Sequence, residues 1–428
     1  MAWDFSTEPE FEKKLAWMRE FVRDEILPLE TLDLSREQYA RITAPLKEKV
    51  KEQGLWAAHL PPELGGGGFG QVKLGLMHEI LGQCRFAPGI FGNQAPDSGN
   101  AELLAIGGSP EQKEQWMFPL LRGELKSCFS MTEPGAGADP TLLTTSAVLD
   151  GDEYVINGHK WFSSNASAAD FLIVMAVTDP DVSPYQGSSM IIVPVDTPGV
   201  NVLRDIPVMD HSTVTPQLEG GHAEVLYENV RVPKANLVGN PGDGFALAQQ
   251  RLGPGRIHHA MRWLGQSKRA FDMLCERAVS RHTHGSVLAD KQMIQDWVAL
   301  SAAEMQAARL LTLQAAWTMD QVGASNARLE IGMIKYWGAK VLHDVIDRAI
   351  QIHGSLGFSG DLPLEQMYRS ARAARIYDGP DEVHKATVAK RILRGYEPRE
   401  VPTEHVPTRE AAARRKFAQY LELATAND

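Results

Sequence analysis

The chain has 428 residues, of which 43% are hydrophobic and 23% charged, and its formal net charge is −11. This composition is typical of a globular protein with two or three folding units, and the acidic balance argues against a nucleic-acid partner. The three cysteines lie far apart and form no CxxC pair, so they predict neither a disulfide framework nor a zinc site.

The start of the chain and its hydropathy predict a cytoplasmic protein. Residues 1–10 have neither the basic n-region nor the apolar h-region of a secretory signal, and they are too acidic for a transit peptide. No stretch approaches the roughly 20 apolar residues that a membrane-spanning helix needs. We therefore expect no membrane span.

Residues 1–127 are predicted to form an N-terminal helical domain. Apolar side chains at helical spacing mark a first helix, which is expected to end before Pro28. These side chains are Phe11, Leu15, Met18, Phe21, Val22, Ile26 and Leu27. Gly65–Gly68 predicts a flexible loop, and Leu74–Leu81 predicts a further helix.

Residues 128–240 are predicted to form a middle β-domain. Ser146–Leu149 and Tyr154–Ile156 flank Asp150 and Gly151, a hairpin signal, although Asp152 and Glu153 are expected to make the loop longer than two residues. Four further β-rich runs follow, separated by Pro, Gly and Asp: Phe171–Thr178, Met190–Val195, Val200–Ile206 and Ala223–Val232.

Residues 241–397 are predicted to form a C-terminal helical bundle. Apolar residues between Met293 and Leu313, and again between Ile334 and Ile350, indicate helices longer than the usual 11–12 residues or so. Residues 398–428 form a C-terminal extension, in which the charged segment Glu410–Lys416 predicts a helix.

The most informative segment runs from Arg375 to His384 and places Asp378 at a Gly-Pro break. Helix-like stretches flank this break, Gln366–Tyr377 before it and Glu382–Leu393 after it, and proline disfavours helical geometry in the residue before it. Asp381 is expected to cap the second helix. On this segment alone two interpretations stay open. Asp378 is either a solvated acid at an ordinary corner or a general base facing a buried site.

A glycine-containing loop, Thr132–Asp139, opens the β-region. Gly135 and Gly137 allow backbone N–H groups to approach a planar or anionic ligand, although the loop could simply need positive φ. It matches neither a P-loop nor the dinucleotide-binding pattern.

Two pairs of histidines raise the question of a metal site. His282 and His284 lack a third ligand at diagnostic spacing, and His258 and His259 point to different faces of a presumed helix. We therefore predict no metal site.

Three motifs, Thr132–Gly137, Asn157–Asn165 and Glu228–Pro233, resemble the middle domain of acyl-CoA dehydrogenases in order and spacing. Further matches follow at Arg256, Ser280–Gly285, Gln292, Gln351–Gly357 and the Asp378 segment. The resemblance extends from the first helix to about residue 395. It implies a multi-domain fold of an N-terminal helical domain, a middle β-barrel-like domain and a C-terminal four-helix bundle.

Two segments resemble the branch that contains acyl-CoA dehydrogenase family members ten and eleven. One is Asp378–His384, and the other is Ala95–Asn100, whose polarity indicates that the pocket floor receives more than a plain alkyl chain.

The resemblance implies FAD between the middle and C-terminal domains. Phe129, Met131 and Thr132 would line the flavin, and Thr132 would hydrogen-bond its ring. Gly137 and Ala138 would lie beside the flavin and the acyl-CoA phosphates. Phe162 would stack where the family usually has tryptophan, and Ser164 would contact the flavin. Taken alone, an apolar residue such as Phe162 is more often part of a core. These positions are Phe129, Met131, Thr132, Gly137, Ala138, Phe162 and Ser164.

A second set of residues would touch the FAD of a neighbouring subunit. Arg281 and Thr283 would hold its pyrophosphate, although Arg281 could also form a surface ion pair. Gln351 and Gly354 would lie near the adenosine. The other cofactor-binding residues that the resemblance implies, without assignment to one subunit, are His284, Gln292, Pro380 and Glu382. His284 replaces a phenylalanine, and Pro380 replaces a threonine that often touches the flavin.

The resemblance makes Asp378 the base that removes the α-proton of a thioester, where the family usually has glutamate. The other known location of the base is occupied by Gly255. We expect burial to raise the pKa of this carboxylate from about 3.9. The implied substrate-binding residues are Ala138, Arg256, Gly379 and Asp97, with Arg256 near the CoA or supporting the turn.

The predicted activity is FAD-dependent α,β-dehydrogenation of an acyl-CoA thioester, with electrons passed to an electron-transfer flavoprotein. The family implies a homodimer or homotetramer. Two alternatives stay open: a flavin oxidase of the nitroalkane-oxidase type, which also uses aspartate as base, and a non-catalytic flavoprotein of the same fold.

Overall fold

The computed structural model describes residues 5–209 and 221–425, which divide into two compact units. The first unit extends to Lys385 and the second begins at Ala386. Among the described residues, no helix combines the length and the apolar character that crossing a bilayer requires.

The N-terminal part of the first unit is helical. Its α-helices are α1 (Pro9–Phe21), α2 (Arg36–Glu52), α3 (Gln71–Leu81), α4 (Ala87–Ile90), α5 (Asp97–Gly107), α6 (Pro110–Gln112) and α7 (Phe118–Arg122). The predicted end of the first helix before Pro28 is confirmed, since α1 ends at Phe21, but a helical path extends further. A π-turn, Val22–Ile26, and a 3-10 helix, Leu27–Thr31, continue it. Pro28 fits there because the first turn of a helix does not use its backbone N–H groups.

A mainly antiparallel sheet forms the middle of the chain. Its described strands are β1 (Ser127–Ser130), β2 (Ser146–Asp150), β3 (Glu153–Ser164), β4 (Phe171–Val177), β5 (Ser188–Pro194), β6 (Val200–Asp205), β7 (His222–Pro233) and β8 (Leu237–Val238). The path through the sheet is β6-β7-β3-β1-β4-β5-β8, with β2 beside β3 and β4. All four predicted β-rich runs after the hairpin are confirmed as strands.

The β2–β3 hairpin is tighter than its sequence predicts. Asp150 pairs with Glu153, which leaves Gly151 and Asp152 as a two-residue loop. Gly151 has φ +64°, as such tight turns require. The prediction of a longer loop is therefore wrong.

Strands β4 and β5 are apolar on both faces because each face contributes to a different core. One core takes Phe171, Ile173 and Met175 together with Leu104 of α5. The core on the other face takes alternate residues of the same strands, with side chains of β3 and β7. Helices therefore cover one face of this part of the sheet, and the sheet packs on itself at the other.

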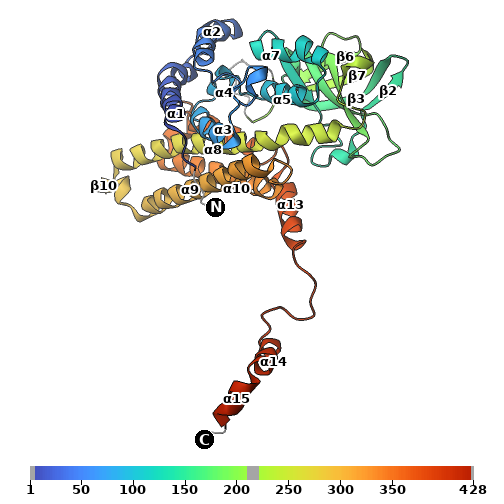
Figure 1. Cartoon of the computed structure of the whole chain (residues 1–428). Coiled ribbons are helices and arrows are strands. Elements are labelled where there is room, and N and C mark those ends of the chain that lie inside the picture. Colours follow the sequence, from blue (N-terminus) through green and yellow to red (C-terminus); the bar gives the residue numbers. More distant parts are fainter. Residues whose placement is uncertain (1–4, 210–220, 426–428) are drawn as a thin grey trace. The chain divides into compact units, whose positions relative to one another are not determined.

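Long helices form the rest of the first unit. They are α8 (Gly244–Ser280), α9 (Gln292–Val322), α10 (Arg328–His353), α11 (Ser355–Phe358), α12 (Leu364–Ala373) and the start of α13 (Asp381–Leu393). A short hairpin, β9 (His282–Thr283) and β10 (Ser286–Val287), joins α8 to α9. Figure 1 shows α8 running from the sheet, past the N-terminal helices, to this hairpin.

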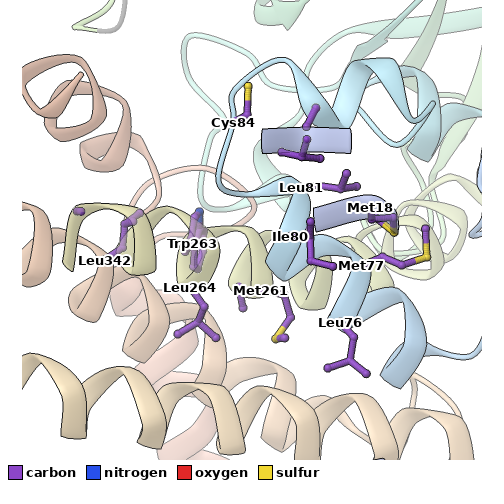
Figure 2. Close-up of a cluster of buried hydrophobic side chains, with 14 of the residues drawn as sticks. Met18, Leu76, Met77, Ile80, Leu81, Cys84, Met261, Trp263, Leu264 and Leu342 are labelled. Carbon is purple, nitrogen blue, oxygen red and sulfur yellow. The ribbon is translucent and has the colours of Figure 1, made fainter. Parts of the chain in front are cut away.

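The largest core joins the N-terminal helices to the long helices. Side chains of α3, such as Met77 and Ile80, gather with Met261 and Leu264 of α8 in one buried cluster (Figure 2). Helix α8 packs against α3, α9 and α10, so it connects all parts of the first unit. The buried side chains of α8 are therefore packed against several other helices.

Two predictions at the Asp378 break need correction. The first helix ends at Ala373 rather than Tyr377, and a turn leads from there to Asp378. Asp381 is the first residue of α13 rather than a cap before it. Its carboxylate accepts a hydrogen bond from Arg375 Nε at 2.7 Å.

The second unit contains the end of α13, then α14 (Val406–Lys416) and α15 (Ala418–Thr425). Helix α14 includes the predicted charged helix, and its side chains are almost all exposed.

Candidate active site

Asp378 lies on a strained turn between α12 and α13. Its φ is +54°, and that of Gly379 is +95°. A β-carbon at position 379 would also come within 2.7 Å of His384 Nε2, so only glycine fits. Left-handed backbone at a non-glycine residue costs free energy and clusters at functional sites. This strain therefore marks the turn as a candidate site.

The side chain of Asp378 is not a solvated acid. It is 24% exposed, and its Oδ2 lies 3.2 Å from His259 Nε2 on α8. The backbone carbonyl of Asp378 accepts hydrogen bonds from Arg256 Nε at 3.2 Å and from His384 Nε2 at 3.1 Å. The geometry favours the second interpretation of this segment, a carboxylate facing a mostly buried site.

The pKa of Asp378 lies well below its usual range. Burial raises it, but the hydrogen bond from His259 and the positive charges of Arg256 and Arg251 outweigh burial. The shift is opposite to the predicted rise. Asp378 is consequently ionised at neutral pH and can accept a proton.

A fully buried lysine holds the same turn from α10. Lys335 Nζ donates to the carbonyl of Ala374 at 2.7 Å and to that of Gly379 at 3.3 Å. Burial lowers its pKa to about 8, while the charge of Asp378 opposes this shift. Lys335 therefore keeps its positive charge at neutral pH. Together with Arg256, it binds backbone carbonyls of the turn from two different helices.

Arg251 connects β1 with the region of Asp378. Its guanidinium carbon lies 4.1 Å from the centre of the Phe129 ring, and its Nε donates to Asn100 Oδ1 at 3.2 Å. The expected substrate residue Asp97 lies in the same network. The Oδ1 atom of Asp97 accepts two hydrogen bonds from Ser127, one from the backbone N–H at 2.8 Å and one from the side-chain hydroxyl at 2.7 Å. Phe129 and Asp97 thus lie in one network with Arg251, whose positive charge also acts on Asp378.

The glycine loop is anchored by a buried ion pair. Lys160 Nζ lies 2.8 Å from Glu133 Oε1 and donates to the Met131 carbonyl at 2.7 Å. Glu133 also accepts from Thr144 and Thr145 at 2.7–2.9 Å. Beyond this anchor the loop is open, because Gly137 and Ala138 are exposed.

The surface beside this loop suits a planar cofactor. Added β-carbons at Gly135 and Gly137 would meet nothing within 4 Å, so the backbone is accessible. Phe162 has φ +48° and is 42% exposed, which excludes a core role. The Ser164 hydroxyl lies 2.8 Å from His222 Nδ1. An accessible backbone next to an exposed ring fits an aromatic ring system with polar edges.

The second set of predicted cofactor residues lies far from the first. Arg281 and Thr283 are at the α8–α9 connection, and Gln351 and Gly354 end α10. The stretch of α8 from Arg251 to Arg281 is about 45 Å long. One chain therefore cannot place both sets on the same part of a cofactor. Of the remaining predicted residues, Pro380 and Glu382 flank Asp381 at the Asp378 turn. His284 lies in the turn of the β9–β10 hairpin, and Gln292 is the first residue of α9.

The histidine pairs form no metal site in the part of the chain that the structure describes. No group of three possible ligands occurs there. His258 stacks on His78 with ring centres 4.3 Å apart, whereas His259 faces Asp378, so the two point to different faces as predicted.

Sequence reasoning missed His259, His384, Arg251 and Lys335. The sequence pattern around His259 raises only the question of a metal ligand. Lys335 and Arg251 do carry a signal, because each is a charged residue on the apolar face of a long helix. Their role at the turn became visible only in three dimensions.

Three family models match successive parts of the chain. They are the acyl-CoA dehydrogenase N-terminal domain (residues 8–124), middle domain (128–219) and C-terminal domain (242–393). These domains define the class of flavin-dependent oxidoreductases that act on acyl-CoA. The chain belongs to the acyl-CoA dehydrogenase family. The predicted fold class, the family and the FAD cofactor are confirmed.

Relatives confirm the predicted branch. The chain is 43% identical to acyl-CoA dehydrogenase family member 11 of Rattus norvegicus, over 83% of this chain and 45% of that protein. It is 41% identical to acyl-CoA dehydrogenase family member 10 of Mus musculus, over 90% of this chain and 37% of that protein. It is 45% identical to the probable acyl-CoA dehydrogenase FadE2 of Mycobacterium tuberculosis, over 82% of this chain and 86% of that protein. The chain thus spans less than half of family members 10 and 11.

Solved structures share the fold. A putative acyl-CoA dehydrogenase from Mycobacterium abscessus has a TM-score of 0.85 and 39% identity, covering 92% of this chain and 100% of that one. Butyryl-CoA dehydrogenase from Megasphaera elsdenii has a TM-score of 0.77 and 26% identity, with the same coverage.

Proposed function

We propose that the chain catalyses the α,β-dehydrogenation of an acyl-CoA thioester with Asp378 as the base. One observation carries this proposal. In an acyl-CoA dehydrogenase fold, the strained turn presents an ionised, largely buried carboxylate that accepts a hydrogen bond from His259.

The role of Asp378 is to take the α-hydrogen as a proton, so that a C–H bond breaks and an O–H bond forms on the carboxylate. FAD supplies the acceptor for the β-hydrogen, which leaves as hydride. Aspartate is one methylene shorter than glutamate, so its carboxylate has less reach. The position of the backbone that carries it therefore matters more. Arg256, His384 and Lys335 bind backbone carbonyls of the turn and its approach, which limits the misplacement of the base.

Both sets of predicted cofactor residues serve FAD in this proposal. Phe129, Met131, Thr132 and the loop at Gly137 hold the flavin. Arg281 reaches the pyrophosphate of a neighbouring subunit's FAD. The 45 Å or so of helix between the two sets supports this division, because one flavin nucleotide can use both only if two subunits contribute. The proposal includes assembly into a homodimer or homotetramer, as is usual in the family, and passage of the electrons to an electron-transfer flavoprotein.

The central test is anaerobic reduction of the bound flavin. We expect acyl-CoA to bleach the flavin absorbance rapidly, with little peroxide formed in air. A panel of acyl-CoAs that includes 3- and 4-hydroxyacyl forms identifies the substrate class, since Asp97, Asn100 and Arg251 make the neighbourhood of Phe129 polar. Bleaching by neutral nitroalkanes but by no acyl-CoA would contradict the proposal in favour of a nitroalkane-oxidase activity. Failure of both classes of substrate would favour a non-catalytic flavoprotein.

The pyrophosphate role of Arg281 predicts weaker cofactor binding in Arg281→Ala. Hydrogen bonds to charged groups contribute about 1.5–3 kcal/mol, so we expect the Kd for FAD to rise about 10- to 100-fold. Fluorescence titration of the apoprotein measures it. His282→Ala is the matched control because His282 is the exposed neighbour on β9. Equal affinity in Arg281→Ala and wild type would remove Arg281 from the cofactor site.

A further inference from the structure

The carboxylate of Asp378 and its backbone carbonyl have different partners. His259 Nε2 contacts the carboxylate at Oδ2, 3.2 Å away. Arg256 and His384 instead donate to the backbone carbonyl. Among the described hydrogen bonds to this residue, that of His259 therefore orients the side chain, whereas the others hold the main chain.

His259 itself is confined by aromatic rings. Its ring centre lies 5.1 Å from that of Tyr377 and 6.2 Å from that of Trp263, and Trp263 Nε1 donates to the Tyr377 hydroxyl at 3.0 Å. Lys335 Nζ lies 5.4 Å and 5.2 Å from the Trp263 and Tyr377 ring centres. Trp263 is in turn part of the buried cluster of α8 (Figure 2). The imidazole therefore has little freedom to turn away from Asp378.

His259 is neutral at neutral pH. Burial lowers its pKa, and the nearby positive charges of Arg262 and Lys335 act in the same direction, while Asp378 opposes them. The charged and titratable groups around the pair come from the turn, α3, α8, α10 and α13: Asp378, His78, Arg251, Arg256, His258, Arg262, Lys335, Asp381 and His384. A neutral imidazole whose Nε2 faces an ionised carboxylate serves it as an N–H donor.

We propose that His259 is the positioning residue of the base, an inference that rests on the function proposed above. Its Nε2–H donates to Asp378 Oδ2 and leaves Oδ1 to take the α-proton. The α-C–H bond breaks, the O–H bond forms on Oδ1, and the electron pair of the α-C–H bond becomes the Cα=Cβ double bond. The β-C–H bond breaks at the same time, and its electron pair leaves with the hydrogen as a hydride that FAD would accept. His259 stays neutral throughout and does not touch the reacting atoms.

The test compares variants that keep or remove the donor. His259→Phe keeps a planar ring without an N–H group, and His259→Gln places an amide N–H at similar reach. His258→Phe is the matched control, because the adjacent ring packs on His78 rather than Asp378. Anaerobic stopped-flow measurements follow flavin reduction by acyl-CoA from about pH 3 to pH 9, so that the range extends below the usual pKa of an aspartate.

We expect His259→Phe to slow reduction about 10- to 100-fold and to move the acidic limb of the rate profile up by about one pH unit or more. His259→Gln should recover most of the rate. In His258→Phe the acidic limb of the rate profile should stay at the same pH as in wild type. An unchanged rate and limb in His259→Phe would overturn the inference. So would equal shifts in both Phe variants, because a general structural effect would then be the cause.

A second readout needs no turnover. Infrared titration of the substrate-free protein follows protonation of the Asp378 carboxyl, with Asp378→Asn identifying its band. We expect protonation at higher pH in His259→Phe than in wild type, and an equal pH would overturn the inference. If wild type is not reduced by any acyl-CoA, the proposed function fails, while the titration still decides the role of His259. If His259→Phe does not fold, His259→Met gives the same comparison.

Discussion

Asp378→Asn is expected to slow flavin reduction by acyl-CoA by about 10³-fold or more while FAD stays bound. General base catalysis contributes about 10²–10⁴-fold, and asparagine cannot take the α-proton. Asparagine has nearly the same shape and tolerates positive φ, so the turn at +54° is kept. Anaerobic stopped-flow absorbance measures the rate, and the flavin spectrum after gel filtration measures retained FAD.

Asp378→Glu is the matched control for this variant. It keeps the carboxylate but lengthens it by one methylene, so we expect a measurable rate between those of wild type and Asp378→Asn. A wild-type rate in Asp378→Asn would remove Asp378 from the mechanism. Loss of FAD together with activity would instead indicate that the residue is needed for the structure of the site.

Lys160→Met is expected to lower the free energy of unfolding by about 3–5 kcal/mol, since it leaves a buried carboxylate without its cation. The side chains of Lys160 and Glu133 are 0% and 4% exposed. The same ammonium group binds the Met131 carbonyl, so its loss also releases the strand that leads into the glycine loop. We therefore expect weaker FAD binding as well. Urea unfolding followed by circular dichroism measures the stability.

The double variant Lys160→Met/Glu133→Gln separates the ion pair from packing. Because the buried charge is then absent, we expect it to be more stable than Lys160→Met alone. Arg122→Ala, which breaks an exposed ion pair with Glu124, is expected to change little. A Lys160→Met protein as stable as Arg122→Ala would show that the buried pair contributes nothing.

The pH dependence of this ion pair follows from the lowered pKa of Glu133. Burial raises that pKa, but Lys160 and the threonine hydrogen bonds outweigh it and lower the value from 4.5 to about 2. The stability that this ionised group contributes is complete above pH 4.5 and is lost as the pH falls toward about 2. In Lys160→Met we expect this acid-induced loss to be smaller, since the folded-state pKa moves up.

Much of the secondary structure is readable from local patterns. Alternating and continuous apolar runs located the strands from Phe171 to Val232, and helical spacing located α9 and α10. The errors fall at ends and turns, such as the start of α13 at Asp381 and the loop at Gly151. There, a difference of one or two residues depends on backbone geometry that composition does not determine.

The ordered motifs from Thr132 to His384 were sufficient by themselves to determine the family, the three-domain fold and FAD as cofactor. They also singled out Asp378. Only the tertiary structure decided that its pKa is lowered rather than raised. The reason is that His259, Arg256 and Arg251 are distant from Asp378 along the chain and approach it only when α8 packs against the turn. Electrostatic effects depend on distances in space, which sequence spacing does not give.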